Sequence, residues 1–283
     1  MCNIALQHKP LPGGFRQTCN TPDCLGDLEN ARAMNGFTHL LKWCALALLA
    51  PSLCLAQADY AREKRWADEV VPAIVVGEPL QLELKSGRKF LAIWAPNAKA
   101  TAGVVVVHGL GVHPDWGLIN PLRSQLNEQG YATLSVQMPV LAADALGEHY
   151  PPLFPEAVER LAAAVAFLRG KGLKKIGIVS HSMGARMADY FTKHTGEVRV
   201  DVWVVIGFSG EFTEPAAFKA PVLDLHGEKD LPAVLAYAGQ RAAALKQVRG
   251  SGQVQVAGAD HFFTGMENEL VRQVKLFLDN RLR

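Results

Sequence analysis

Short apolar runs of strand length recur along the chain from residue 80 to residue 256. They predict eight strands, at residues 80–84, 89–95, 103–107, 132–136, 175–179, 200–206, 221–225 and 253–256. Two stretches, 104–107 and 203–206, contain no polar residue, which is typical of strands buried on both faces of a sheet. The first two runs have no helical pattern between them and therefore predict a hairpin.

Between most of the later strands, apolar residues recur three to four positions apart, which predicts helices. The predicted helices cover residues 118–129, 156–168, 185–194, 232–247 and 267–282. Alternation of strand and helix implies right-handed crossovers and a mostly parallel sheet. We therefore expect an α/β fold, a single three-layer sandwich over residues 79–283, with ligand chemistry at the carboxyl ends of the strands. Residues 59–78 precede it as an N-terminal segment.

Residues 34–58 have the pattern of a secretory signal peptide. Lys42 supplies a positive flank, and the apolar run at residues 43–55 is too short to span a membrane. Ala56 and Ala58 are small, as signal peptidase requires, so we expect cleavage near Ala58 and a periplasmic or secreted protein.

A polar extension upstream of an export signal is unusual, which makes Met34 the expected start of translation. Residues 1–33 are then non-native upstream translation or a disordered leader. Leu53, where a lipoprotein site needs a small residue, argues against a lipid anchor on Cys54. All five cysteines lie within the first 54 residues, so the exported chain would fold without disulfides.

The formal net charge of the 283-residue chain is only +2, and no basic stripe interleaves with aromatic residues. This composition argues against nucleic acid as a partner and favours a small-molecule or acyl-chain substrate. No metal or organic cofactor is implied. In particular, Cys19 and Cys24 belong to the upstream leader and lack the further ligands of a metal site.

Residues 176–185 read Ile-Gly-Ile-Val-Ser-His-Ser-Met-Gly-Ala, the pattern of a nucleophile elbow between a strand and a helix. Ser182 would project alone from the sharp turn, in a strained backbone conformation. The residues two positions before and after it must be small, and they are Ser180 and Gly184. Glycine is usual at the first of these positions. Taken alone, the pattern also fits an ordinary strand-to-helix turn with a capping serine.

A serine nucleophile needs a histidine base and a carboxylate that orients it. Asp230 and His261 follow the strands predicted at residues 221–225 and 253–256, which is where such residues would meet Ser182. Asp230 could instead cap the helix that begins at Pro232. The rival acids are Asp224 and Glu228, and His261 could be an ordinary loop histidine.

Acyl transfer also needs two backbone N–H groups that bind the developing oxyanion. The residue after the nucleophile, Met183, would supply one of them. Leu110, in the loop His108-Gly109-Leu110-Gly111 after an apolar strand, would supply the other. His108 is interpreted as a structural residue beneath this loop and not as a base.

With these motifs in order, residues 79–283 resemble the alpha/beta-hydrolase superfamily. Residues 108–116 (His-Gly-Leu-Gly-Val-His-Pro-Asp-Trp), with 119–123 and 130–133, further resemble an exported bacterial subfamily of unknown function. The superfamily resemblance implies hydrolysis of an ester or related acyl bond through an acyl-enzyme on Ser182. The subfamily resemblance implies no substrate.

Only residues 207–220 separate two late strands, which leaves no room for an inserted cap domain, so the site should be open. The residues expected to contact substrate are Trp116, Leu141, Phe212 and Phe262. The sequence thus predicts an exported esterase, lipase or thioesterase, with peptidase or dienelactone-type activity as a variant on the same residues. The alternative, motivated by Ser180, is a non-catalytic envelope protein that retains the fold as a binding module.

Overall fold

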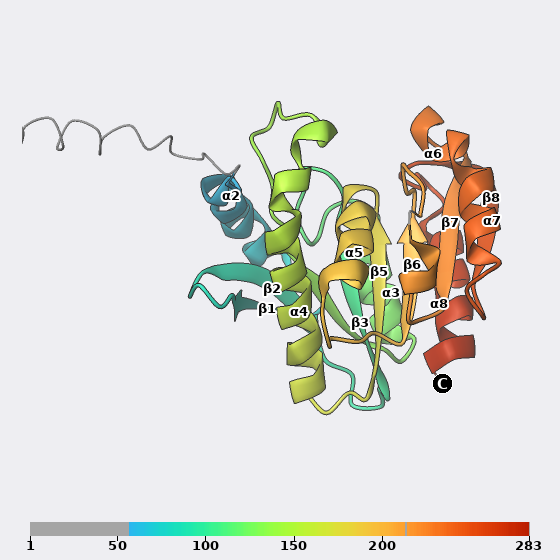
Figure 1. The fold of residues 1–283 in the computed structure, drawn as a ribbon. Helices are drawn as coiled ribbons and strands as arrows, with labels where there is room; N and C mark the ends of the chain where they lie inside the picture. Colours follow the sequence, from blue (N-terminus) through green and yellow to red (C-terminus); the bar gives the residue numbers. More distant parts are fainter. Residues whose placement is uncertain (1–56, 213, 283) are drawn as a thin grey trace, which may run out of the picture. The chain divides into compact units, whose positions relative to one another are not determined.

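The computed structural model describes residues 57–212 and 214–282 (Figure 1). The predicted upstream leader and the predicted signal peptide up to residue 56 lie outside these residues. One eight-stranded sheet has the order β1-β2-β4-β3-β5-β6-β7-β8. The strands are β1 (Glu78–Glu83), β2 (Lys89–Ala95), β3 (Ala102–Val107), β4 (Ala132–Val136), β5 (Lys175–His181), β6 (Val202–Ile206), β7 (Val222–Lys229) and β8 (Gly252–Asp260). Strand β2 pairs antiparallel with β1 and β4, and every other pairing is parallel.

Helices cover both faces of the sheet. They are α2 (Tyr60–Val70), α3 (Ile119–Glu128), α4 (Phe154–Gly170), α5 (Met183–His194), α6 (Pro232–Ala236), α7 (Ala238–Leu245) and α8 (Glu267–Leu282). Helices α4 and α5 lie side by side in front of the sheet in Figure 1, and α3 and α8 lie behind it. Along β3, Val105 and Val107 join the core under α4 and α5, whereas Val104 and Val106 join the core under α3 and α8. The predicted three-layer α/β fold is confirmed, and continuous apolar runs are explained by burial on both faces.

Two elements differ from the sequence prediction. The helix expected at residues 232–247 is two helices, α6 and α7, because the backbone of Tyr237 leaves the helical region at φ −104° and ψ 2°. Strands β7 and β8 also continue beyond their predicted ends, to Lys229 and Asp260. This extension brings Asp230 and His261 to the residues that directly follow two paired strands.

The N-terminal segment forms helix α2, which the apolar pattern did not predict. Asp59 caps this helix by accepting a hydrogen bond of 2.9 Å from the Arg62 N–H. The Asp59 N–H donates to the Val140 carbonyl at 2.7 Å, and Ala58 is only 5% exposed. From Ala58 onward, the N-terminal segment is therefore packed against the segment that follows β4.

A buried ion pair holds α2 against α4. The Arg160 guanidinium, fully buried, lies 2.9 Å from the Glu63 carboxylate and also donates to Glu156. Burial raises the pKa of Glu63, against the charge and hydrogen bond of Arg160 that lower it. The same guanidinium donates to the Gln137 carbonyl at 2.9 Å, so one side chain joins α2, α4 and the end of β4.

We expect Arg160→Met to lower the free energy of unfolding by about 3–5 kcal/mol, because Glu63 would stay buried without its partner. Urea unfolding followed by circular dichroism measures this change. The matched control is Lys64→Met on α2, the helix that carries Glu63, since Lys64 pairs with Asp68 in solvent and should contribute less than about 1 kcal/mol. Equal effects of the two substitutions would contradict the role given to the buried pair.

Candidate active site

Ser182 occupies a sharp turn between β5 and α5. Its backbone has φ 54° and ψ −118°, and Ser182 and Phe263 are the two non-glycine residues with positive φ in the described part of the chain. The Ser182 N–H donates to the Ile206 carbonyl at 2.9 Å, which fixes the turn against β6. This is the strained geometry predicted for a nucleophile elbow.

The two small residues around Ser182 are used differently. Gly184 is needed for close approach, because a Cβ atom there would lie 2.2 Å from the His108 carbonyl oxygen. Ser180 is fully buried, and its hydroxyl accepts a hydrogen bond of 2.8 Å from the Trp203 indole N–H. The same hydroxyl lies 3.3 Å from the Val204 carbonyl, to which it can donate. Serine in place of the usual glycine is therefore accommodated and hydrogen-bonded.

Ser182, His261 and Asp230 form a continuous chain of hydrogen bonds. The Ser182 Oγ atom lies 3.1 Å from His261 Nε2, and His261 Nδ1 lies 2.5 Å from Asp230 Oδ1. Burial alone would raise the pKa of Asp230, but hydrogen bonds from His261 and from the backbone outweigh it and lower that pKa. An ionised Asp230 keeps the proton on His261 Nδ1, which leaves Nε2 free to accept the serine proton.

The rival acids are engaged elsewhere. Asp224 is fully buried in an ion pair with Arg241 at 2.8 Å. Glu228 is exposed and accepts the Gly258 N–H. Asp230 is not the helix cap that the sequence allowed, because α6 begins after Leu231 and has no side-chain cap.

His108 sets the direction of one peptide in the predicted oxyanion loop. Its Nε2 atom accepts the Met138 N–H at 2.9 Å, so its proton is on Nδ1, which donates to the Gly109 carbonyl at 2.9 Å. In a planar trans peptide the following N–H points the opposite way, so the Leu110 N–H is directed away from His108. His108 is buried, and burial lowers its pKa to about 3, which keeps it neutral.

The oxyanion loop also touches the nucleophile. A Cβ atom on Gly109 would lie 3.3 Å from Ser182 Cβ, so only glycine allows this approach without displacement of its neighbours. No hydrogen-bond partner is found for the N–H of Leu110 or of Met183 within the described residues. These two N–H groups are the ones that the sequence predicts as oxyanion donors, and the described part of the fold leaves both of them unused.

His181 also lies in the candidate site, although no sequence pattern singled it out. It is buried, and its ring centroid lies 4.7 Å from that of His261. Its Nε2–H donates to the His261 carbonyl at 3.0 Å, which ties the nucleophile turn to the histidine loop. Burial lowers its pKa to about 3, so this donor is neutral. Its place directly before Ser182 was the available signal.

Of the residues expected to contact substrate, Phe262 and Trp116 lie together beside His261, whereas Phe212 lies elsewhere. Phe262 is 46% exposed, and its ring lies 5.0 Å from the His261 ring and 5.4 Å from the Trp116 ring. Leu141 is partly buried against the core. The structure does not bring Phe212 to the site, because this ring is only 5% exposed and packs between Trp203 and two other phenylalanines.

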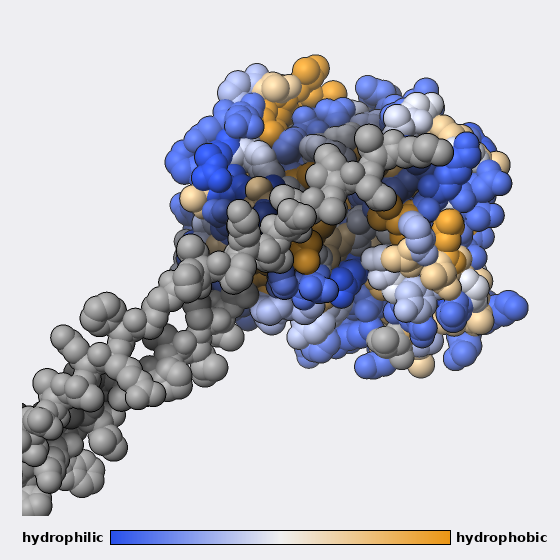
Figure 2. Space-filling view, turned by 90° about the horizontal axis from the view of Figure 1, so that it is seen from above, coloured by the Kyte–Doolittle hydropathy of each residue, from blue (hydrophilic) through white to orange (hydrophobic). Residues whose placement is uncertain are grey.

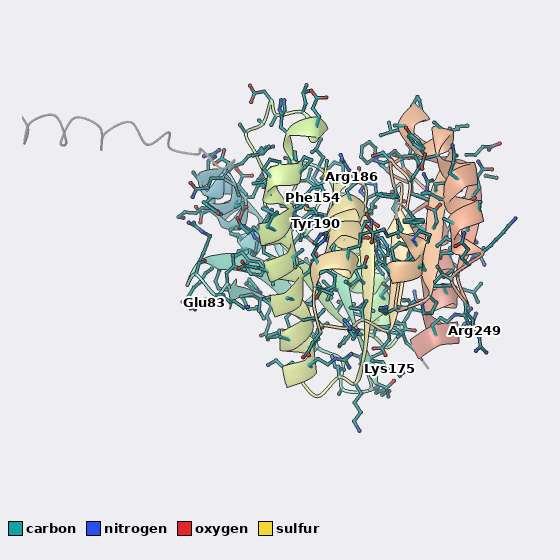
Figure 3. All side chains as sticks on the ribbon, in the orientation of Figure 1. Glu83, Phe154, Lys175, Arg186, Tyr190 and Arg249 are labelled. Carbon is teal, nitrogen blue, oxygen red and sulfur yellow. The ribbon has the colours of Figure 1, made fainter. Side chains whose placement is uncertain are left out.

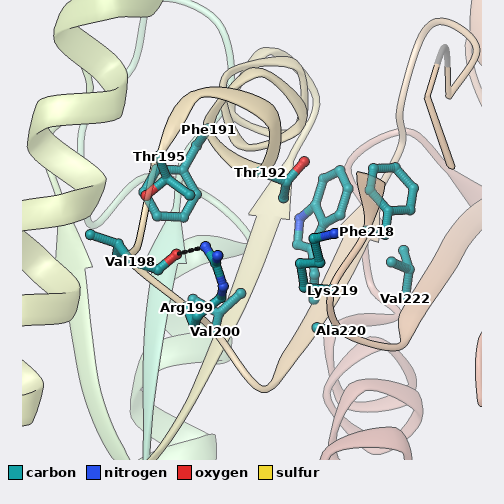
Figure 4. Close-up of a pocket in the computed structure, with 11 residues that line it drawn as sticks. Phe191, Thr192, Thr195, Val198, Arg199, Val200, Phe218, Lys219, Ala220 and Val222 are labelled. Atoms are coloured by element: carbon teal, nitrogen blue, oxygen red, sulfur yellow. Dashed lines mark hydrogen bonds between the residues drawn. The ribbon is translucent and has the colours of Figure 1, made fainter. Parts of the chain in front are cut away.

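Two hollows lie along α5. The one drawn in Figure 4, at the helix end far from Ser182, has a volume of about 30 Å³, which suits roughly one or two water molecules rather than a substrate. The other has a volume of about 230 Å³ and is lined by Phe154, Arg186, Tyr190 and Phe208 among others. Figure 3 shows the first three of these close together between α4 and α5. Arg186 lies one helical turn after Ser182, whose carbonyl accepts its N–H at 3.3 Å.

Two further features are properties of the described residues alone. Among residues 57–212 and 214–282, no three His, Cys, Asp or Glu side chains come together in a way that could hold a metal ion. No helix in the same part of the chain has both the length and the apolar character needed to cross a membrane.

Comparison with known proteins supports the fold. A family described as proteins of unknown function (DUF3530) matches residues 78–152. Similar solved structures include a dienelactone hydrolase from Anabaena variabilis (21% identity, TM-score 0.59, 72% of this chain and 97% of that chain). An esterase from Pyrococcus furiosus is also similar (16% identity, TM-score 0.60, 73% and 91%). So is a serine hydrolase without a lid from Xanthomonas campestris (15% identity, TM-score 0.53, 73% and 95%). No match was found among curated proteins.

The predicted resemblance to alpha/beta hydrolases is thus confirmed in the fold. The predicted resemblance to a family of unknown function is confirmed over residues 78–152. At these identities the solved structures establish the fold alone.

The neutral histidines predict how stability depends on pH. His108 and His181 have pKa values of about 3 in the folded chain, below the ordinary value of 6.5. Between these pH values the unfolded chain binds more protons than the folded chain. The stability that the two neutral histidines contribute is therefore fully present above pH 6.5 and is lost as the pH is lowered. Each histidine contributes a slope of up to about 1.4 kcal/mol per pH unit.

Urea unfolding at pH 7.5 and pH 5 measures this loss, in a range above the ordinary pKa of carboxylates. His181→Asn should reduce the dependence of the free energy of unfolding on pH by the amount that one histidine contributes. A free energy of unfolding that does not change between the two pH values would show that the buried histidines are not held neutral.

Proposed function

We propose that this protein is an exported serine hydrolase that cleaves a carboxylic ester or related acyl bond through an acyl-enzyme on Ser182. The observation that carries the proposal is the hydrogen-bonded chain from Ser182 Oγ through His261 to Asp230, at 3.1 Å and 2.5 Å. The positive φ of Ser182 supports it, since this conformation exposes the hydroxyl at the edge of the sheet.

The chemistry follows from the positions of the protons. As Ser182 Oγ bonds to the carbonyl carbon, its proton moves to His261 Nε2, and Asp230 stabilises the imidazolium through Nδ1–H. The carbonyl oxygen becomes an oxyanion and accepts the N–H groups of Leu110 and Met183. His261 then gives its proton to the leaving alcohol. Water attacks the acyl-enzyme by the same route and releases the acid.

Apolar side chains around this edge support an ester with an apolar group. Four of the large apolar residues that are exposed in the described chain lie here: Leu110 (40%), Leu146 (58%), Leu231 (46%) and Phe262 (46%). Figure 2, which looks onto this edge, shows apolar patches set among polar residues. The hollow beside Arg186 offers room for one arm of the substrate. Exposed apolar surface of this kind commonly marks a binding site.

Export is part of the proposal and rests on the leader pattern at residues 34–58. The packing of Ala58 refines the expected cleavage position. A cut directly after Ala58 would remove a buried side chain and leave a charged amine on Asp59, whose N–H now donates to Val140. A cut after Ala56 keeps this packing and also has a small residue, Cys54, two positions earlier.

We expect a fluorophosphonate probe to label the protein on Ser182, because only an activated serine reacts with it. Ser182→Ala should abolish labelling, and both Ser182→Ala and His261→Ala should lower kcat/KM for p-nitrophenyl esters by at least about 10³-fold. Labelling gels and steady-state kinetics are the measurements. Ser86→Ala, in the exposed hairpin turn, is the matched control and should keep full activity.

A fully active Ser182→Ala protein would refute the proposed mechanism. A folded wild-type protein that neither reacts with the probe nor hydrolyses esters over a broad pH range would favour the non-catalytic binding protein instead.

When the chain is expressed from Met34 in a Gram-negative host, we expect the periplasmic fraction to contain a form that begins at Gln57. Intact-mass spectrometry distinguishes this start from one at Asp59. Uncleaved protein confined to the cytoplasm would contradict the proposal of export, without bearing on the hydrolase chemistry.

A further inference from the structure

The Arg62 guanidinium joins two loops at the sheet edge from which the nucleophile projects. Its Nη2 atom donates to the Gly111 carbonyl at 2.9 Å, and its Nη1 atom donates to the Leu141 carbonyl at 2.7 Å. Gly111 belongs to the loop after β3, and Leu141 belongs to the segment after β4. Neither loop has regular secondary structure at these residues, so their carbonyls depend on donors from elsewhere.

The position of Arg62 is fixed on several sides. Helix α2 is anchored next to it by the buried pair of Glu63 and Arg160. The guanidinium carbon lies 4.4 Å from the centroid of the Trp66 ring, and that ring contacts His113 edge-on at 5.9 Å. A planar guanidinium held in this way can serve two carbonyls at once, which a lysine ammonium on a flexible stem does less well.

These contacts bracket the predicted oxyanion donor. On one side of Leu110, the Gly109 carbonyl accepts from His108. On the other side, the Gly111 carbonyl accepts from Arg62, and Gly111 adopts φ 63°, which favours glycine. The Leu110 N–H therefore belongs to the first of two anchored peptides, and it has no partner of its own among the described residues.

We propose that Arg62 is a positioning residue that holds the Leu110 N–H toward the oxyanion, which makes helix α2 a working part of the active site. This inference rests on the proposed hydrolase function. Because the oxyanion forms only as the carbonyl is attacked, Arg62 acts on the transition state and not on substrate binding. Loss of Arg62 should therefore change kcat and leave KM nearly unchanged.

The experiment compares Arg62→Ala and Arg62→Lys with Arg65→Ala in the full chain, using p-nitrophenyl butyrate. Arg65 is an exposed residue of the same helix and serves as the matched control. We expect Arg62→Ala to lower kcat by about 10- to 100-fold, less than or equal to the loss of a complete oxyanion donor. Arg62→Lys should fall between Arg62→Ala and the wild type, and Arg65→Ala should match the wild type.

Chemical rescue separates positioning from a general loss of structure. Guanidinium chloride at non-denaturing, millimolar concentration should restore part of the kcat of Arg62→Ala, and sodium chloride at equal ionic strength should not. Ser182→Ala should show no rescue. This readout depends on refilling the site between the two carbonyls, which a global change in stability would not reproduce.

Two outcomes would overturn the inference. One is a kcat of Arg62→Ala within about twofold of the wild type. The other is a loss of kcat that guanidinium does not rescue and that is no larger than the loss in Arg160→Met, a variant that is destabilised to the same melting temperature but keeps Arg62. If the proposed function itself fails, the wild-type protein will hydrolyse no ester and take no fluorophosphonate label, which is a different result from either of these.

Discussion

The turn at Ser182 is the constraint on which the rest of the site depends. A non-glycine residue in this strained conformation costs on the order of 1–3 kcal/mol and persists only where its surroundings hold it. Here β6 holds it through the Ile206 carbonyl, and the missing side chain of Gly184 lets α5 approach the end of β3. Ser180 adds a hydrogen bond with Trp203 beneath the turn. Interactions with the central strands thus offset the conformational strain at Ser182.

Three histidines near this turn, His108, His181 and His261, have different roles because their surroundings differ. His108 and His181 are buried without an acid partner, so they stay neutral and donate to the carbonyls of Gly109 and His261. His261 is the one that meets a carboxylate, at 2.5 Å. The same side chain therefore serves as a fixed donor in two positions and as the candidate base in the third, and Asp230 makes the difference.

The sequence revealed the sheet well because burial on both faces leaves unbroken apolar runs, as in 104–107 and 203–206. Ser182, Asp230 and His261 could be chosen because each follows a strand in a parallel sheet, and such strand ends meet at one edge. Helix α2 was not predicted, because its sequence is polar and it is held in place by the pairing of Glu63 with Arg160, 97 residues further along the chain. Phe212 was expected in the substrate site as an aromatic residue of a loop, but its aromatic neighbours are brought together only by the fold.

Arginines from the surrounding helices explain how irregular loops can hold a precise site at the edge of this sheet. Strand ends release carbonyl groups that no neighbouring strand can satisfy, and an unpaired buried carbonyl is costly. Arg62 serves Gly111 and Leu141, Arg160 serves Gln137, and Arg241 serves Gly210 and Val234. The carbonyls of Gly111, Leu141, Gln137 and Gly210 belong to the loops after β3, β4 and β6, and the carbonyl of Val234 belongs to helix α6, which follows β7. A guanidinium stays charged and offers five N–H donors in a rigid plane, so one side chain can join two loops where a hydroxyl or an amide would reach fewer. The sheet therefore sets where the reacting residues stand, and the arginines set how the loops around them are oriented.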